Sequence, residues 1–394
     1  MSKTVHIVGI GMNSVTGEAG RIIAAADVLI GAQRMLEAFA DLKKRSFCAY
    51  RPREVAEIIE NNDAARFAVL MSGDVGFFSG AAALKNPLEA YDVKLIAGVP
   101  TVSDFCAKLK MPWQDIKLAS AHGVETNIAS LVRRNRRVFC LTGGNTGEIG
   151  ETLTNAGLGD VTVHIGERLG YSDERITFTI ASRLAEGEYD ALTALIIENE
   201  GFDDTMQTGM PDTDFARVDA VPMTKSEVRA VSLSKLRLSP RAVCYDIGAG
   251  TGSVTVEMAL AAHLGHVYAI EKNEIALPII EENCREFHID NVTIINGYAP
   301  DVFDALPPPD AAFIGGSSGK LKGIIAALLE KNPRVKIVVN AIALESAAGA
   351  IKELESAGMA NVEAVQISVA RLRPVAGLHM MMGQNPVTVI SAGG

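Results

Sequence analysis

The stretch that decides the fold is CYDIGAGTGSVTVEMA, residues 244–259. Its first residues are apolar enough to predict a buried strand that ends near an aspartate. Three alternating glycines follow, and glycine permits positive φ and lets the backbone approach a ligand closely. The remaining residues predict a helix whose first N–H groups are unpaired and carry the positive end of the helix dipole. Such a turn suits a dinucleotide, a methyl donor or a phosphate.

The spacing of the glycines narrows that choice. A dinucleotide fingerprint is G-x-G-x-x-G, which would require its third glycine at the position of Ser253. Here the glycines are Gly248, Gly250 and Gly252. The spacing G-x-G-x-G after Asp246 is typical of Rossmann-like methyltransferases that use S-adenosylmethionine, in which the turn meets the amino-acid and ribose portion of the donor. We therefore predict that Asp246 and the three glycines bind this donor.

Three later loops fit the same interpretation. Glu271 ends the next predicted strand, HVYAIE, where its carboxylate can accept hydrogen bonds from both ribose hydroxyls. Gly297 lies in INGYAPD, and Gly315 and Gly316 lie in FIGGSSG, each after a further strand. The carboxyl edge of an open α/β sheet is where ligands bind. We expect these four residues to complete the donor site.

Elsewhere, short β-branched runs alternate with helical stretches, the pattern of α/β folds. From 201 to 222 the chain has five Asp, two Pro and little apolar period, which predicts a linker or a partly ordered crossing segment at 204–221. We expect two unlike α/β domains, 1–203 and 222–394. The predicted strands are 4–10, 66–72, 92–98, 116–121, 137–142, 162–167, 191–199, 242–250, 266–272, 291–297, 311–316, 335–341, 362–368 and 385–391.

The composition argues against several classes of protein. The net charge of −10 and the pI near 5.3 disfavour a nucleic-acid partner, because neutralising phosphates needs a basic face. The basic run RRNRR at 133–137 is interpreted as a solvated helix end. The five cysteines form no CxxC pair and the seven histidines no HExxH, so we predict no metal site. The start MSKTVHIVGIG predicts a strand rather than a signal peptide, and no uncharged apolar run reaches ~18 residues. We expect a cytoplasmic protein that binds no membrane.

The second half resembles a known family. The segments MTKSEVRAVSLSKLRLSPRAVCYDIGAGTGSVTVEMA, YAIEKN, APDVFDALPPPDAAFIGGSSG and VNAIALES are similar to the C-terminal domain of the precorrin-6Y C5,15-methyltransferase (decarboxylating) family of cobalamin biosynthesis. The resemblance covers nearly all of 222–394. One departure is Tyr245, where that family frequently has tryptophan. The resemblance implies a Rossmann-like class I methyltransferase fold.

The first half resembles the tetrapyrrole methylase family, which binds the same donor with a different α/β fold. VHIVGIGMNS, LMSGDVGFFSGA, IAGVPTVSDFCAKLKMPW, SAHG and IGERLGYSDERIT carry the resemblance, which spans almost all of 1–203. It implies that Gly9, Gly73, Asp74, Thr101 and Ser103 contact a second molecule of S-adenosylmethionine. The sequence departs from the family's pattern at two positions, with Val in place of Pro after Asp74 and with Thr101 where Ser is common.

Together the two resemblances imply a bifunctional enzyme that methylates a precorrin at C5 and C15 and removes CO₂ from the ring C acetate, giving precorrin-8X. They also imply self-association. Because the substrate carries many carboxylates and the protein is acidic, local cations must face it. Lys225 and Arg229 share one predicted helical face beside the donor site, and Thr224 and Glu227 could supply hydrogen bonds or a proton relay. We predict these four as catalytic residues.

Other interpretations stay open at this point. Arg371 and Arg373 are weaker candidates for substrate cations, and His122 fits a loop residue better than an acid or base. A two-domain nicotinamide oxidoreductase is one alternative, disfavoured by Ser253. A non-catalytic protein that binds S-adenosylmethionine or a tetrapyrrole is another. An RNA methyltransferase is a third for the second half, since fold does not fix function.

Overall fold

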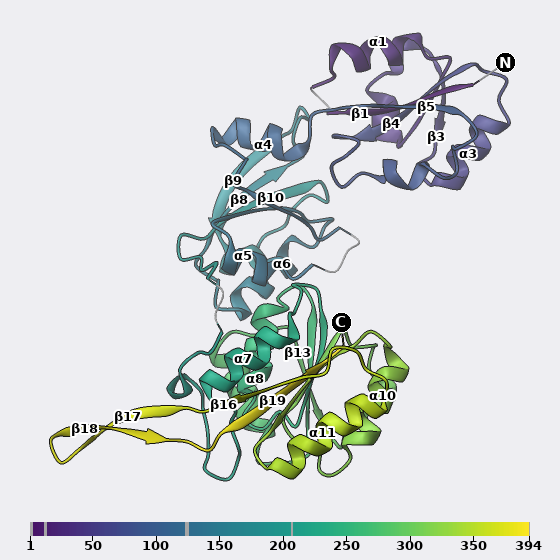
Figure 1. Cartoon of the computed structure of the whole chain (residues 1–394). Coiled ribbons are helices and arrows are strands. Elements are labelled where there is room, and N and C mark those ends of the chain that lie inside the picture. Colours follow the sequence, from purple (N-terminus) through teal and green to yellow (C-terminus); the bar gives the residue numbers. More distant parts are fainter. Residues whose placement is uncertain (1–2, 12–13, 123–125, 206–207, 394) are drawn as a thin grey trace. The chain divides into compact units, whose positions relative to one another are not determined.

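The computed structural model describes residues 3–11, 14–122, 126–205 and 208–393 (Figure 1). Five residues of the stretches quoted above lie outside these ranges: Met1, Ser2, Met12, Asn13 and Gly123. The chain divides into two compact units, Met1–Asp203 and Asp204–Gly394, and each is described by itself.

The first unit opens with a parallel sheet in the order β3-β2-β4-β1-β5. Its central strands β1 and β4 are buried over most of their length, as expected for a parallel sheet covered on both faces. Thr16 begins the first helix, since its side chain accepts a hydrogen bond from the Ala19 N–H at 3.1 Å. The elements of this part are β1 (Thr4–Ile10), α1 (Gly17–Ala25), β2 (Val28–Gly31), α2 (Gln33–Glu37), β3 (Arg45–Cys48), α3 (Pro52–Glu60), β4 (Arg66–Ser72) and β5 (Asp92–Ile96).

The same unit contains a second sheet, which is mixed, in the order β6-β7-β10-β8-β9. Only β6 and β7 are parallel, and the remaining neighbours are antiparallel. Helix α4 packs its buried face on this sheet around Phe105 and Phe139. The elements of this part are α4 (Thr101–Leu109), β6 (Lys117–Ser120), α5 (Ile128–Arg134), β7 (Arg137–Leu141), α6 (Thr146–Asn155), β8 (Thr162–Glu167), β9 (Arg175–Ile180) and β10 (Thr193–Glu198).

The second unit is built on a seven-stranded sheet in the order β13-β12-β11-β14-β15-β19-β16. Its strands are parallel up to β15, and β19 runs antiparallel to both of its neighbours. The strands are β11 (Val243–Ile247), β12 (His266–Glu271), β13 (Val292–Asn296), β14 (Ala311–Ile314), β15 (Lys336–Ala341), β16 (Glu363–Ile367) and β19 (Val387–Ala392).

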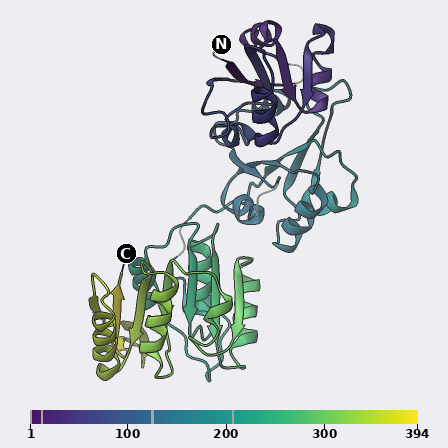
Figure 2. The ribbon, with the colours of Figure 1, turned by 90° about the vertical axis from the view of Figure 1, so that its right-hand side faces the viewer.

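Helices cover both faces of this sheet (Figure 2). On one face α7, α8 and α9 contact one another in sequence, and on the other face α10 contacts α11. Tyr245 and Phe303 lie in the core beneath α10 and α11, while Met258 and Phe313 lie in the core beneath α7 and α8. The helices are α7 (Ser226–Leu236), α8 (Ser253–Ala261), α9 (Leu277–Glu286), α10 (Leu321–Lys331) and α11 (Leu344–Ser356).

The segment 204–221, expected to be a linker, is from residue 208 onward part of the second unit. Met210 and Phe215 are buried in a cluster with Val256 and Ile280 of helices α8 and α9. The Asp-rich composition suggested a solvated chain, but Asp212 is itself buried and paired with arginines. The expectation of a linker is therefore corrected for the described part of this segment.

A two-stranded hairpin, β17 (Ala370–Val375) and β18 (Leu378–Gly383), projects from the second unit (Figure 1). Nearly all of its side chains are exposed, including large apolar ones such as Leu378 and Met381. Among the described residues, every helix is too short or too polar to cross a lipid bilayer.

Candidate active sites

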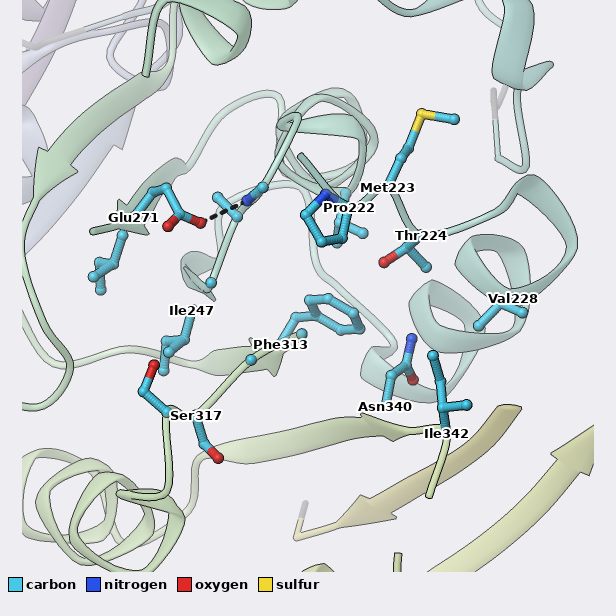
Figure 3. A pocket seen from close by; sticks show the side chains of 18 of the residues that line it. Pro222, Met223, Thr224, Val228, Ile247, Glu271, Phe313, Ser317, Asn340 and Ile342 are labelled. Carbon is cyan, nitrogen blue, oxygen red and sulfur yellow. Dashed lines mark hydrogen bonds between the residues drawn. The ribbon is translucent and has the colours of Figure 1, made fainter. Parts of the chain in front are cut away.

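A cavity of about 630 Å³ opens at the carboxyl edge of the seven-stranded sheet (Figure 3). Its volume falls in the range of small-molecule sites. It is walled by the loops that follow β11, β12, β13, β14 and β15, together with the segment that precedes α7. The predicted residues that line it are Thr224, Lys225, Gly248, Gly250, Glu271, Gly297, Gly315 and Gly316.

The turn between β11 and α8 needs its glycines for conformation and for space. Gly248, Gly250 and Gly252 all have positive φ, between +58° and +77°. A Cβ on Gly248 would come within 2.8 Å of the Gly316 nitrogen, and one on Gly250 within 2.6 Å of the Pro222 carbonyl oxygen. Side chains at the first two positions would therefore push the surrounding loops apart.

Glu271 fixes this turn. One carboxylate oxygen accepts a hydrogen bond from the Gly250 N–H at 2.8 Å (Figure 3), and the other accepts from the Lys272 and Asn273 N–H groups, both at 2.8 Å. These three bonds hold the carboxylate at the cavity wall and leave it acceptor capacity for a hydroxyl. The structure thus joins Glu271 and Gly250, two residues that the sequence analysis predicted separately.

Asp246 lies behind the turn rather than on the cavity wall. It is completely buried, and one of its oxygens accepts a hydrogen bond from the Thr255 hydroxyl at 2.5 Å. The other oxygen has no partner among the described residues. Burial raises the pKa of this carboxyl to about 7, with a smaller contribution from the charge of Glu271. Gly252 also does not line the cavity, so both residues are placed to support the turn.

The structure corrects the expectation that Arg229 faces the substrate. Its side chain is completely buried, and its Nε donates to Glu257 at 2.6 Å while its Nη1 donates to Asp212 at 3.2 Å. The same Nη1 donates to the Thr224 carbonyl oxygen at 2.6 Å. The guanidinium also stacks over Phe215, 4.7 Å from the ring centroid. Arg229 therefore holds the segment before α7 in place and has no face toward the cavity.

Glu227 is likewise turned away from the cavity. Arg371 of strand β17 donates to both of its oxygens, at 2.7 and 3.2 Å, and the Ser226 hydroxyl donates at 3.1 Å. The hydrogen bonds from Arg371 lower the pKa of Glu227 below its usual range. A carboxylate held ionised in this way is a poor proton relay. Arg371 thus anchors the hairpin, while Arg373 is exposed.

The cations that do line the cavity are lysines. The ammonium of Lys225 is 4.0 Å from Asp212, and its side chain is 42% exposed, so it is free to reach a ligand. The Lys272 ammonium lies 5.3 Å from the ring centroid of Tyr298. The Lys320 ammonium lies 5.4 Å from the same centroid and forms an ion pair with Asp301. Lys225 and Lys272 therefore line an otherwise largely apolar cavity, and Lys320 lies beside Tyr298 of its wall.

The first unit has its own cavity, of about 520 Å³, between the strand ends of its two sheets. Gly73 and Thr101, two of the residues predicted to contact the donor, line this cavity. Gly9 lies just behind, where a Cβ would come within 2.6 Å of the Gly73 carbonyl oxygen and 2.7 Å of the Gly98 nitrogen. Glycine at position 9 thus lets the ends of β1 and β4 approach the loop after β5.

Asp74 and Ser103 hold the loops of this cavity rather than lining it. The Asp74 carboxylate accepts hydrogen bonds from the Gly76 N–H at 2.8 Å and the Gly98 N–H at 3.0 Å. It therefore ties the loop after β4 to the loop after β5. Ser103 lies in the first turn of α4, with its N–H donating to the Pro100 carbonyl oxygen.

Several residues that line the two cavities were not predicted from the sequence. In the first unit, Arg34 donates to the Tyr171 hydroxyl at 2.8 Å, and both line the cavity together with His122. In the second unit, Tyr298 and Asn340 line the cavity. The only available signal was position, because Asn340 ends a predicted strand and Tyr298 follows Gly297.

Each half of the chain matches the model of a known protein family. A model described as the precorrin methyltransferase domain matches residues 216–393, and one described as tetrapyrrole (corrin/porphyrin) methylases matches residues 4–185. A Sinorhizobium protein named precorrin-6Y C(5,15)-methyltransferase (decarboxylating) is 29% identical over 98% of this chain and 96% of its own length.

Shorter relatives match about half of the chain. A Pyrobaculum calidifontis protein named "Probable cobalt-precorrin-6B C(15)-methyltransferase (decarboxylating)" is 42% identical over 47% of this chain and 95% of its own length. A crystal structure titled precorrin-6Y C5,15-methyltransferase, from Geobacter metallireducens, is 39% identical, covers 48% of this chain and 97% of its own, and has a TM-score of 0.45. With one relative matched along both whole chains and another matched at 42% identity along nearly its full length, the chain belongs to the precorrin-6Y C(5,15)-methyltransferase (decarboxylating) family.

Proposed function

We propose that this chain is a bifunctional enzyme that methylates a precorrin at C5 and C15 with S-adenosylmethionine and removes CO₂ from its ring C acetate, giving precorrin-8X. The first unit methylates C5, and the second methylates C15 and releases CO₂. The observation that carries this proposal is the presence of a separate cavity at the strand ends of each unit, lined in both cases by glycine-containing loops. The full-length relative is named for both methylations and for decarboxylation.

In the second unit the donor would be held by the turn and by Glu271. The N–H groups of the turn and of the first residues of α8 suit the donor's carboxylate. Glu271 is already oriented by three backbone N–H groups and faces the cavity, so it would accept a hydrogen bond from a ribose hydroxyl. Gly297, Gly315 and Gly316 line the remaining walls, and a Cβ on Gly316 would meet no described residue other than its chain neighbours within 4 Å.

In the first unit the donor would bind among the strand ends around Gly73 and Thr101. Gly9 and Asp74 shape that site from behind, since one allows the close backbone approach and the other ties two loops together. Both units thus offer backbone groups to the donor, but the first has its cavity between two sheets and the second at the edge of one.

The chemistry requires little from the protein beyond positioning. The conjugated enamine of a reduced tetrapyrrole supplies the electron pair for the new C–C bond, the C–S bond of the sulfonium breaks, and sulfur keeps that bond's pair. The methylated carbon then loses a proton. In decarboxylation the C–C bond to the carboxylate breaks, its electron pair enters the conjugated imine, and the former methylene carbon takes up a proton. An enclosed site that aligns these groups provides most of the acceleration.

The substrate's carboxylates would meet Lys225 and Lys272, which line the second cavity. Lys225 is partly exposed and faces the cavity, and Lys272 and Lys320 flank Tyr298. In the first unit Arg34 is the cation at the cavity, where it is oriented by Tyr171. These local charges would attract a polyanion to a chain that is acidic overall.

We also propose that the chain self-associates. The hairpin β17–β18 supports it, because Leu372, Leu378 and Met381 are each more than half exposed on a flat two-stranded ribbon. Such a surface is costly to leave in water. The substitution Leu378→Glu is expected to lower the sedimentation coefficient of the chain. An unchanged value would argue against self-association through the hairpin.

The experiment that tests the proposal is calorimetric titration of the full chain with S-adenosylhomocysteine, the product form of the donor. The expected stoichiometry is two per chain. A parallel titration with NADH is expected to show no binding, which would separate this function from a nicotinamide oxidoreductase. A stoichiometry of one, or binding of NADH, would overturn it.

A further inference from the structure

The second cavity extends well beyond the glycine turn and Glu271. Its lining follows the carboxyl edge of the sheet from the loop after β13 to the end of β16 at Ile367. Five strand spacings of about 4.8 Å separate β12 from β16, so the lined edge between Glu271 and Ile367 is about 24 Å long. Figure 3 shows Glu271 at one end, Ile342 at the other, and Thr224 and Phe313 between them. The residues proposed to hold the donor follow β11, β12, β13 and β14, which leaves the end over β15, β19 and β16 without an assigned ligand.

This unassigned end, called the distal end from here on, is built where three strands meet. The register places Val387 of β19 beside Ile367, and Ile342 directly follows β15, which pairs with the other side of β19. Next to them the Gln384 N–H donates to the Val369 carbonyl oxygen at 2.8 Å, which closes the base of the hairpin β17–β18. The residues of the distal end that line the cavity are Ile342, Ile367, Val369, Gln384, Asn385 and Val387.

The hairpin base is held in place by ion pairs. Arg371 of β17 donates to Glu227 at 2.7 Å and to Asp212 at 3.1 Å. Asp212 is buried and also accepts a hydrogen bond from Arg229 at 3.2 Å. The hairpin base is thus tied to the segment before α7, whose Lys225 lines the same cavity. The wall at the distal end is therefore formed before a ligand binds.

The distal end combines accessible apolar side chains with groups that suit carboxylates. Ile342 is 69% exposed, and Val369 is half-buried. Asn385 is exposed and Gln384 is partly exposed, so both amides can turn their N–H groups toward an acceptor. Lys225 adds a positive charge to the same cavity. This surface matches a ligand with broad apolar faces and a rim of carboxylates.

We propose that the distal end binds the reduced tetrapyrrole that the second unit methylates and decarboxylates. The inference rests on the proposed function and names where the substrate of this unit lies. The ring packs against Ile342 and Val369, and the two amides of the distal end bind its carboxylates. Donor and ring then meet between the two ends of the cavity, near Thr224 and Phe313 (Figure 3). Burial of the apolar faces supplies affinity, while the polar groups determine which edge of the ring faces the donor.

The test is the rate of CO₂ release by the full chain at rising concentrations of a reduced precorrin, with S-adenosylmethionine in excess. Because the proposed function assigns CO₂ release to the second unit, this rate reports on the second cavity. Wild type is compared with Ile342→Glu and Gln384→Glu, which both place a carboxylate beside those of the substrate. We expect the half-saturating precorrin concentration to rise about tenfold in each variant. Calorimetry with S-adenosylhomocysteine should still give two sites per chain with unchanged affinity.

The matched control is Leu344→Glu. Leu344 lies two residues after Ile342, is 77% exposed and does not line the cavity. The substitution adds the same charge to the same part of the surface. The half-saturating precorrin concentration of this variant should stay within about twofold of wild type.

Three results would overturn the inference. The first is an unchanged half-saturating concentration in both Ile342→Glu and Gln384→Glu, and the second is an equal rise in Leu344→Glu. The third is loss of one site for S-adenosylhomocysteine in both cavity variants, because the donor rather than the substrate would then occupy the distal end. Failure of the proposed function itself looks different, because wild type would then release no CO₂ at any precorrin concentration.

Discussion

Glycines stand at the strand ends around both cavities, but their structural roles differ between the two units. In the second unit Gly248 and Gly250 have positive φ and form a tight turn that Glu271 clamps from the next strand. In the first unit Gly9 and Gly98 allow their two backbone segments to lie close together. A Cβ on either residue would collide with the backbone of the other and with the Gly73 carbonyl oxygen. The difference teaches that a cavity at strand ends can be built from a turn and a helix start, or from the converging ends of several strands.

The units also differ in how they bury charge. The second unit encloses Arg229 with Glu257 and Asp212, and it encloses Asp246 without a cation. In the first unit the carboxylate at the site, Asp74, is bound only by backbone N–H groups of two loops. The second unit should therefore be sensitive to the loss of Arg229, and Asp246 should make its stability depend on pH.

The largest effect is expected for Arg229→Leu. Removing one partner of a buried ion pair leaves Glu257 and Asp212 uncompensated and costs about 3–5 kcal/mol. The single tryptophan, Trp113, lies in the first unit, so its fluorescence reports on that unit in urea unfolding. We expect the circular dichroism transition of the second unit to shift to lower urea while the tryptophan transition stays in place.

The control for this prediction is Arg373→Ala, an exposed position on the hairpin. It should change stability by no more than about 0.5 kcal/mol. The prediction is contradicted if Arg229→Leu moves both unfolding transitions to lower urea, or moves neither. In either case the buried ion pairs of Arg229 would not stabilise the second unit selectively.

The next effect is a pH dependence confined to the second unit. The pKa of Asp246 is about 7 in the folded chain and near 3.8 when unfolded, so the folded state binds the proton more tightly. Stability is therefore greatest below the unfolded pKa and is lost as pH rises through 7, by up to about 4 kcal/mol. In Asp246→Asn this loss should disappear, because asparagine does not ionise and can still accept from Thr255. Urea unfolding of both proteins at pH 5, 6, 7 and 8 measures the difference, and parallel curves would contradict it.

A matched pair of substitutions then separates the donor sites. Gly250→Arg forces a Cβ against the Pro222 carbonyl and should weaken donor binding in the second unit by about 100-fold or more. Gly73→Arg extends a side chain into the first cavity at a position of positive φ, where the backbone cost is about 1–2 kcal/mol. Each variant should keep one site for S-adenosylhomocysteine in calorimetry. Loss of both sites in either variant would show that the two are coupled.

The smallest effect concerns the substrate. Lys225→Ala should weaken binding of the precorrin about tenfold and leave donor binding unchanged, because the lysine faces the cavity from outside the glycine turn. Lys235→Ala is the matched control, since that lysine pairs with Glu363 and does not line the cavity. Equal effects of the two substitutions would point to general attraction by charge rather than a local contact.

The sequence predicts structural features that depend on residues close together in the chain, and it fails for those that depend on distant residues. Strands such as β1 and β11 were predicted because a buried parallel strand is a continuous apolar run. Strands β9 and β17 were not predicted. In β17 two arginines and a proline hide the pattern of a strand, whereas RITFTI of β9 does alternate polar and apolar residues and could have been predicted. The turn around Gly250 was predicted because the spacing of its glycines can be recognised within a few consecutive residues.

The remaining site features depend on distant partners. Arg229 looked like a surface cation because its partners lie in the Asp-rich segment and in α8, neither of which the local pattern connects to it. Asn340 contacts Ser232, which is 108 positions away in the chain. Tertiary contacts of this kind leave no trace in one sequence.

The most direct test of the central claim, that one chain carries two methyl-transfer sites with different work, is the mass of the tetrapyrrole product. Wild type, Gly250→Arg and Gly73→Arg are incubated with a reduced precorrin and S-adenosylmethionine. The account predicts two methyl groups gained and one CO₂ lost for wild type, one methyl and no CO₂ for Gly250→Arg, and one methyl with CO₂ loss for Gly73→Arg. Full conversion by either variant, or CO₂ loss by Gly250→Arg, would contradict it.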